Sequence, residues 1–257
     1  MTIRDGMLDV SQIFGPTIQG EGSAAGRHCL FLRLYGCNLT CAWCDTAYTW
    51  ADTDLKAAKT QSGIKYDKND PALGRKKMSY YDVMDAFDKI WNMNTPTIVV
   101  VSGGEPMMQQ EGLLPVMRGL YRQGHQVHIE TAGTITPMLE FDPYVTQYNV
   151  SPKLAHSGNV LTKRYRPLVL KEFVRTHKAW FKFVVSGIVN RDEQFDEIDR
   201  IVKDNSIPAN RVMVMPEGTD RDDLTLSGRK IVDSALARGY GLSLRMHVDL
   251  WGNVVNK

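Results

Sequence analysis

Short runs of β-branched and aromatic residues recur along the chain, and such runs are typical of strands buried on both faces of a sheet. Segments with apolar residues three or four positions apart separate several of these runs and predict helices. The clearest of them follows Ser79, a residue type that commonly caps a first helical turn. The predicted strands are 28–36, 97–104, 126–131, 145–151, 180–186, 211–216 and 242–248, and the predicted helices are 79–93, 109–123, 191–204 and 227–238.

The alternation of strands and helices predicts an α/β fold with a mainly parallel sheet, either open or curled towards a barrel. Residues 51–78 interrupt this alternation with a polar run, which predicts a solvated surface insertion. No internal repeat or linker divides the sequence, so we expect a single domain over residues 1–257. In sheets of this kind, ligands bind at the carboxyl ends of the strands.

Composition argues against several classes of protein. Hydrophobic residues make up 43% of the chain and charged residues 23%, as in an ordinary globular protein. The 31 basic and 29 acidic residues are mixed along the chain, so we expect no direct contact with nucleic acid. We also expect no membrane association and a cytoplasmic location, because the sequence has neither a run of ~18 apolar residues nor the layout of a secretion signal.

Three of the four cysteines, Cys37, Cys41 and Cys44, lie within one short segment. A structural zinc site normally has four ligands, and no second cysteine pair accompanies these three; a non-catalytic zinc-binding module is kept as an alternative. Cys29 falls in a predicted strand, where we expect a structural role. Three thiolates on one loop can bind three irons of a [4Fe-4S] cluster, which leaves the fourth iron open for a small chelating ligand.

A second motif, SGGEP at 102–106, ends a predicted strand, and its glycines allow a close approach of the backbone to a ligand or another segment. Together with the CxxxCxxC spacing and the aromatic Trp43 before the last cysteine, it resembles the radical S-adenosylmethionine (SAM) enzymes. The resemblance implies a partial (β/α)6 radical-SAM barrel. In that superfamily the Gly-Gly turn receives the amino group of the SAM methionine.

Residues 14–50 resemble one family of radical SAM enzymes, the 7-carboxy-7-deazaguanine synthases of queuosine and 7-deazaguanine biosynthesis. The shared features are the QGEG run at 19–22, Arg33 and CNLxCxWCDT, followed downstream by ETAGT, SPK and FKFVV. The likeness reaches about residue 185 and implies an N-terminal substrate-binding segment, 14–34, and a variable C-terminal tail. The main enzymatic alternative is a glycyl-radical-enzyme activase, which shares the cysteine loop and the Gly-Gly turn but not QGEG.

Membership of this family implies a carbon-nitrogen lyase that converts 6-carboxy-5,6,7,8-tetrahydropterin into 7-carboxy-7-deazaguanine with release of ammonia. The implied cofactors are a [4Fe-4S] cluster, SAM and Mg2+, and SAM is regenerated in each cycle. The implied partners are the pterin substrate, an electron donor such as flavodoxin or ferredoxin, and a second copy of the chain in a homodimer. We expect no histidine or glutamate general base to dominate, and the role of His247 is left open.

The resemblance gives metal-binding roles to residues of the cysteine motif. Cys37, Cys41 and Cys44 would bind the cluster, and Thr46 would bind Mg2+. Magnesium commonly completes its oxygen shell with water and substrate, so a lone hydroxyl suits it only with the substrate carboxylate beside it. A local hydrogen bond that caps the loop is the alternative role for Thr46.

The same motifs imply positions for the substrate and for SAM. Arg33 offers a planar fork for the substrate carboxylate, with a core ion pair to Glu21 or Asp45 as the alternative. The alternative to SAM binding for Lys153 and Lys182 is that each is an ordinary charged residue on the protein surface. The implied substrate-binding residues are Ile18, Gln19, Gly20, Arg33 and Ser102, and the implied SAM-binding residues are Trp43, Cys44, Asp45, Gly104, Ser151, Pro152, Lys153, Lys182, Phe183, Val184 and Val185.

Overall fold

Nine strands form one open sheet in the part of the chain that the structure describes. The structure is a computed structural model, and it describes residues 6–51, 53, 74–252 and 254. Neighbouring strands run parallel from β2 to β9, whereas β1 is antiparallel to both β2 and β3. In sheet order the strands are β3 (Lys76–Met78), β1 (Leu8–Ile18), β2 (His28–Leu34), β4 (Ile98–Gly103), β5 (Gln126–Thr131), β6 (Gln147–Val150), β7 (Ala179–Val185), β8 (Val212–Pro216) and β9 (Gly241–Leu242).

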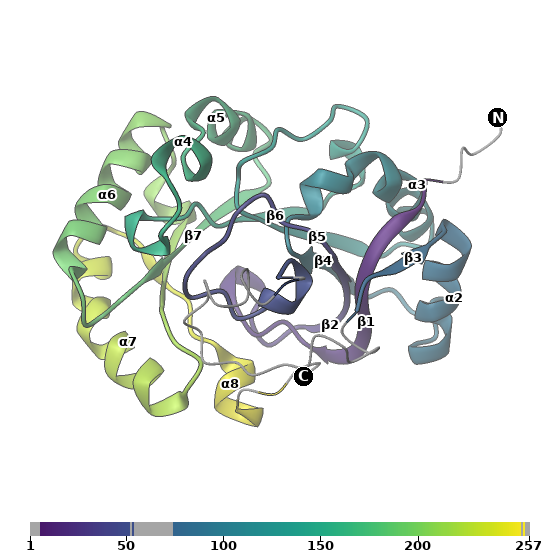
Figure 1. Ribbon diagram of the computed structural model, residues 1–257, viewed down its shortest axis with the longest axis horizontal. Helices are drawn as coiled ribbons and strands as arrows, with labels where there is room; N and C mark the ends of the chain where they lie inside the picture. The colour runs from purple at the N-terminus through teal and green to yellow at the C-terminus, as the bar shows by residue number, and fades with distance from the viewer. Residues whose placement is uncertain (1–5, 52, 54–73, 253, 255–257) are drawn as a thin grey trace.

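Helices lie on the outer side of this curved sheet, as Figure 1 shows. One continuous hydrophobic core joins the two layers, with Val101 and Ile129 from the strands and Phe87 and Phe173 from the helices among its buried members. The inner side of the sheet is left for the segment that follows β2, which carries the cysteines (Figure 1). The helices are α2 (Tyr80–Ile90), α3 (Gln110–Arg122), α4 (Leu161–Arg164), α5 (Pro167–Arg175), α6 (Arg191–Asp204), α7 (Arg221–Leu236) and α8 (Met246–Trp251).

Local sequence explains where α2 begins and which face it buries. The Ser79 hydroxyl accepts a hydrogen bond from the Asp82 N–H, and the Asp82 carboxylate accepts one from the Ser79 N–H, which closes a capping box. Val83, Met84 and Phe87, three or four positions apart, are the buried residues of this helix. The predicted helix at 79–93 is therefore confirmed with its cap, as are the predicted strands that became β2 and β4 to β8.

The last predicted strand, 242–248, is wrong. Only Gly241 and Leu242 pair with β8, and the chain then turns into α8. The Met246 N–H donates to the Gly20 carbonyl at 2.9 Å, so the chain is drawn towards the N-terminal segment. This contact between residues far apart in sequence has no signature in the apolar pattern of 242–248.

Strands β1 and β3 and helices α4 and α5 were not predicted, and one prediction cannot be compared. β1 has an irregular register around Phe14 and Thr17, next to the Gly-Pro pair at 15–16, which hides its alternating pattern. β3 forms at the end of the predicted polar insertion 51–78, whereas residues 52 and 54–73 of that insertion lie outside the described residues. Within the described residues, no helix has the length and apolar character needed to cross a membrane.

Candidate active site

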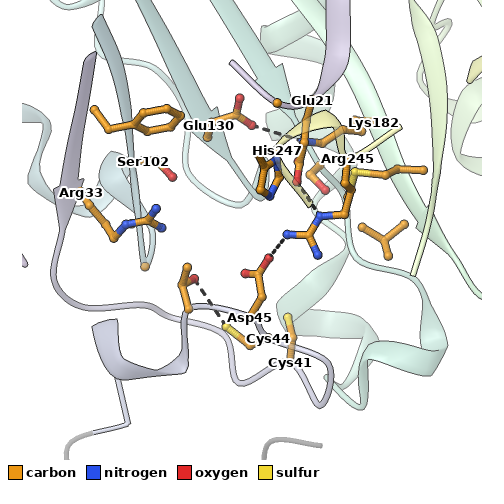
Figure 2. Close-up of a pocket in the computed structure, with 18 of the residues that line it drawn as sticks. Glu21, Arg33, Cys41, Cys44, Asp45, Ser102, Glu130, Lys182, Arg245 and His247 are labelled. Atoms are coloured by element: carbon orange, nitrogen blue, oxygen red, sulfur yellow. Dashed lines mark hydrogen bonds and ion pairs between the residues drawn. The ribbon is translucent and has the colours of Figure 1, made fainter. Parts of the chain in front are cut away.

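A cavity of about 280 Å³ lies at the carboxyl ends of the parallel strands, on the inner side of the sheet. Arg33 from β2, Ser102 from β4, Glu130 from β5 and Lys182 from β7 line it (Figure 2). The cysteine loop, residues 35–50, forms another part of the wall, and the C-terminal segment around Arg245 forms a third. The cavity therefore lies where a parallel sheet is expected to bind its ligand.

Most of the residues singled out in the sequence meet in this cavity. Phe183 and Val185 do not line it; they alternate with Lys182 and Val184 along β7 and belong to the hydrophobic core on the other face. Pro152 is buried outside the lining. The residues that do line it are Ile18, Gln19, Gly20, Arg33, Cys37, Cys41, Trp43, Cys44, Asp45, Thr46, Ser102, Gly104, Ser151, Lys153, Lys182 and Val184.

The cysteine loop presents three thiols to the cavity in apolar surroundings. The Cys44 N–H donates to the Cys41 carbonyl at 3.2 Å, and Leu39 and Trp43 pack against the thiols. Burial raises the pKa of Cys37 to about 12 and the pKa of Cys44 to about 11. A bound metal would take the place of the thiol protons, because cysteine coordinates as the thiolate.

This arrangement suits a cluster better than a single metal ion. Among the described residues, no three His, Cys, Asp or Glu side chains form a group that could hold one ion. Thiolates at three corners of a cube bind separate irons and need no common centre. The residues present therefore fit an iron–sulfur cluster, and this geometry weighs against the zinc alternative.

Gly103 and Gly104 bring the end of β4 against the start of the cysteine loop. The Gly104 N–H donates to the Leu34 carbonyl at 3.2 Å. A Cβ atom on Gly104 would lie 1.9 Å from the Gly36 oxygen, and one on Gly103, whose φ is +129°, would lie 2.2 Å from the Leu34 oxygen. The backbones can approach this closely only because neither residue carries a side chain.

Glu105 locks the turn that the two glycines open. Its carboxylate accepts hydrogen bonds from the Thr131 hydroxyl at 2.7 Å and from the Ala132 N–H at 2.8 Å. Burial raises the pKa of Glu105, and these hydrogen bonds oppose that effect. The Glu of the SGGEP motif thus joins the end of β4 to the end of β5. Both of its carboxylate oxygens accept hydrogen bonds from the protein.

A buried ion-pair network crosses the cavity (Figure 2). The Lys182 ammonium lies 2.5 Å from a Glu21 oxygen and 3.6 Å from a Glu130 oxygen. The Arg245 guanidinium contacts the other Glu21 oxygen at 2.9 Å and also donates to Asp45. Although burial raises the pKa of Glu21, the two cations hold it well below the usual glutamate range, whereas burial leaves the pKa of Glu130 raised.

Arg33 stands outside this network. Its guanidinium lies 5.4 Å from the ring centroid of Phe14 and 6.0 Å from that of Tyr48, and its buried Nε has no hydrogen-bond partner among residues 6–51, 53, 74–252 and 254. The alternative ion pair to Glu21 or Asp45 is not formed among the described residues, because both carboxylates face other cations. An unpaired guanidinium held between two aromatic rings is suited to receive an anionic ligand.

Lys153 is a second cavity cation without a carboxylate partner among the described residues. Its ammonium donates to the Ser151 hydroxyl at 2.9 Å and lies 5.3 Å from the ring centroid of Trp43. Lys153 lines the cavity, so the alternative role left open by the sequence, a charge on the protein surface, does not apply. Thr46 also lines the cavity; its hydroxyl makes no cap hydrogen bond to the short helix that follows it, but it lies 3.8 Å from the Cys44 Sγ in a local loop contact.

The QGEG segment reaches the cavity beside His247. The Gln19 amide donates to a Glu130 oxygen at 3.1 Å, which places a polar side-chain edge at the cavity wall. A Cβ atom on Gly20 would lie 2.0 Å from the His247 Nδ1, so the glycine makes room for that ring. Burial lowers the pKa of His247, although Glu21 opposes this effect.

Sequence reasoning gave no ligand-binding role to Glu21, Glu130, Arg245 and His247, which all line the cavity. Glu21 and Glu130 belong to motifs that were recognised, QGEG and ETAGT, so their presence in those motifs was an available signal. Arg245 and His247 lie in the tail, where the predicted strand was wrong. Only the folded chain brings them to the N-terminal segment.

Comparisons with known proteins show which family this chain resembles. A family model for a 4Fe-4S single cluster domain matches residues 18–151. The 7-carboxy-7-deazaguanine synthase of Pyrobaculum aerophilum is 33% identical and the alignment covers 96% of each chain; that of Hyperthermus butylicus is 30% identical, covering 94% of this chain and 92% of its own. The crystal structure of QueE from Escherichia coli is 26% identical, with a TM-score of 0.64, and covers 94% of this chain and 95% of that one.

Replacing Lys182 with methionine should destabilise the fold strongly. The Lys182 side chain is 8% exposed and that of Glu130 is 20% exposed, so Lys182→Met leaves a largely buried carboxylate without its cation and should cost about 3 kcal/mol at pH 7. The raised pKa of Glu130 lies above the ordinary value of 4.5 and should rise further in the variant. Protonation of the native state then relieves the cost, so the deficit should shrink from pH 7 to pH 5.

Urea unfolding of wild type and variant at both pH values measures this effect. Lys178→Met is the matched control, because Lys178 pairs with Asp142 at 3.0 Å with both side chains about one-third exposed, and it should cost far less. A Lys182→Met deficit that is small, or that grows as the pH falls, would contradict the assigned network.

Proposed function

The chain belongs to the 7-carboxy-7-deazaguanine synthase family, and from this premise we infer that it catalyses the radical SAM ring contraction of 6-carboxy-5,6,7,8-tetrahydropterin, with release of ammonia. The observation that carries the inference is the meeting of three thiols, a Gly-Gly turn and an unpaired arginine around one cavity. A glycyl-radical-enzyme activase must instead admit a protein segment, and neither Arg33 nor Gln19 has a purpose in that reaction.

Cys37, Cys41 and Cys44 would hold the [4Fe-4S] cluster, and Gly104 would offer its backbone to SAM beside them. When bound, the cluster and SAM supply the radical chemistry that removes a hydrogen atom from a substrate carbon. The aromatic ring of Trp43 and the backbone around Ser151 complete the SAM-binding wall. The partial (β/α)6 barrel, formed by β2 and β4 to β8 with their helices, is the frame that we propose for this single domain.

The charges of the cavity suit two anionic ligand groups. Lys182 and Arg245 are already paired with carboxylates, whereas Arg33 and Lys153 have no carboxylate partner in the part of the chain that the structure describes. We assign the substrate carboxylate to Arg33 and the carboxylate of the SAM methionine to Lys153. A ligand carboxylate can form a charge-assisted hydrogen bond with each of these two cations without displacing a protein carboxylate. Fixing both ligands in this way would orient one carbon–hydrogen bond of the substrate towards the radical source.

The pterin ring would lie against polar groups that can form hydrogen bonds with the donor and acceptor atoms along its edge. Gln19 and Glu130 are already joined by a hydrogen bond at 3.1 Å and together offer both donor and acceptor atoms. Ser102 lines the cavity near Arg33, with which its strand position is paired in register. The walls thus bind, orient and dehydrate the substrate, and they leave hydrogen abstraction to the cofactor.

Several further features of the family are proposals for this chain. Thr46 would bind Mg2+ together with the substrate carboxylate, since its hydroxyl lines the cavity. A flavodoxin or ferredoxin would donate the electron, the chain would act as a homodimer, and the enzyme would work in the cytoplasm. None of these features changes the assignment of the cavity residues.

The proposed reaction is tested by its product. Anaerobically reconstituted, reduced protein is incubated with SAM, Mg2+ and 6-carboxy-5,6,7,8-tetrahydropterin, and the mixture is analysed by mass spectrometry. We expect 7-carboxy-7-deazaguanine, with SAM not consumed in proportion to product. Protein that carries four irons per chain but forms no deazaguanine would contradict the proposal, and stoichiometric zinc in place of iron would favour the non-catalytic alternative.

Replacing Arg33 with methionine should weaken substrate binding more than it affects the cluster. A hydrogen bond between charged groups contributes about 1.5–3 kcal/mol to binding. Its loss should raise the KM for the carboxylated pterin about 10–100-fold. Steady-state kinetics, with iron content measured alongside, checks this. The matched control is Arg118→Met, which removes a guanidinium over the Tyr144 ring, outside the cavity, and should leave KM unchanged. An unchanged KM in Arg33→Met would exclude Arg33 as the carboxylate site.

A further inference from the structure

Two side chains outside the CxxxCxxC motif donate N–H hydrogen bonds to its sulfurs, and the Thr46 hydroxyl lies 3.8 Å from the Cys44 Sγ, where either atom could be the donor. The Trp50 indole N–H lies 3.2 Å from the Cys44 Sγ, and the Asn159 amide nitrogen lies 3.3 Å from the Cys41 Sγ. Trp50 is 5% exposed and Asn159 is 8% exposed, so both bonds are sheltered from water. In addition to these, the Leu39 backbone N–H lies 3.4 Å from the Cys37 Sγ.

The position of Trp50 follows from how the cysteine loop closes. The Gly36 N–H donates to the Thr49 carbonyl at 2.7 Å, so the chain returns to its own start directly before Trp50. The Trp50 ring then packs against Ala47 and Cys44 in a small apolar cluster. Because the ring is held by packing, its single N–H is aimed at the sulfur with little freedom to turn elsewhere.

The orientation of Asn159 is fixed by a second hydrogen bond. Its Oδ1 atom accepts from the Thr40 N–H at 2.9 Å, and a backbone N–H can only donate. The oxygen must therefore face Thr40, which leaves the NH2 group towards the Cys41 sulfur. Asn159 follows Gly158, whose φ of +76° ends the turn that places it here, 118 residues after Cys41.

We propose that Trp50 and Asn159 are positioning residues that set the reduction potential of the cluster through hydrogen bonds to two of its three thiolates. The inference rests on the proposed function, since it requires a [4Fe-4S] cluster on these thiols. Reduction adds one electron from the donor to the cluster, and the added negative charge spreads onto the sulfurs. Donors at the sulfurs stabilise the reduced form more than the oxidised form and raise the potential.

A clean test replaces the indole with a ring that has no N–H. Trp50→Phe keeps the apolar packing but removes the donor, and we expect a more negative midpoint potential than in wild type. Asn159→Ala removes the other donor and should shift the potential in the same direction. Trp91→Phe is the matched control, because the Trp91 N–H donates to the Thr95 carbonyl at 3.1 Å, away from the cavity, and its loss should leave the potential unchanged.

The potentials are measured without SAM or substrate, by electron paramagnetic resonance during titration with dithionite, on protein that holds four irons per chain. Midpoints of both variants equal to wild type would overturn the inference, and so would loss of the cluster from both, since the residues would then serve assembly. If only the Trp50→Phe variant fails to bind the cluster, the midpoint potential of the Asn159→Ala variant decides whether the inference holds. Wild type that never assembles four irons would instead refute the proposed function.

Discussion

Glu21 contacts two buried cations at once, and the rest of the active-site arrangement depends on this. Through Lys182 it joins the N-terminal QGEG segment to β7, and through Arg245 it joins that segment to the C-terminal tail and to Asp45 of the cysteine loop. Four stretches of chain that share no secondary structure are held around one cavity in this way. Removing one member of such a network leaves an uncompensated charge in a largely buried site, which destabilises the arrangement.

The same network divides the cations of the cavity into those that are paired with carboxylates and those that are not. Because Lys182 and Arg245 already have carboxylate partners, an incoming anion meets its strongest uncompensated fields at Arg33 and Lys153. The close backbone approach at Gly104 then fixes where the cysteine loop stands relative to β4, and so relative to both cations. Under the proposed function, electrostatics would direct the two anionic ligand groups to Arg33 and Lys153, while backbone packing sets where the thiols lie.

Much of the fold followed from local pattern, because buried parallel strands and a capped amphipathic helix have strong signatures in sequence. The recognised motifs also contain many of the residues that line the cavity. What failed depends on contacts between distant segments: β1 is irregular at Phe14, and the tail becomes a helix where it meets Gly20. For the same reason, the partners of Lys182 and the role of Asn159 were not predictable, since neither has a signature near its own position.

The most direct test of this account is a crystal structure of the reconstituted protein with SAM and the carboxylated pterin bound. The account predicts the pterin carboxylate within hydrogen-bond distance of the Arg33 guanidinium, the SAM carboxylate at Lys153, and Lys182 still paired with Glu21. A pterin carboxylate bound instead to Lys182 or Arg245, with the ion pairs to Glu21 broken, would contradict it.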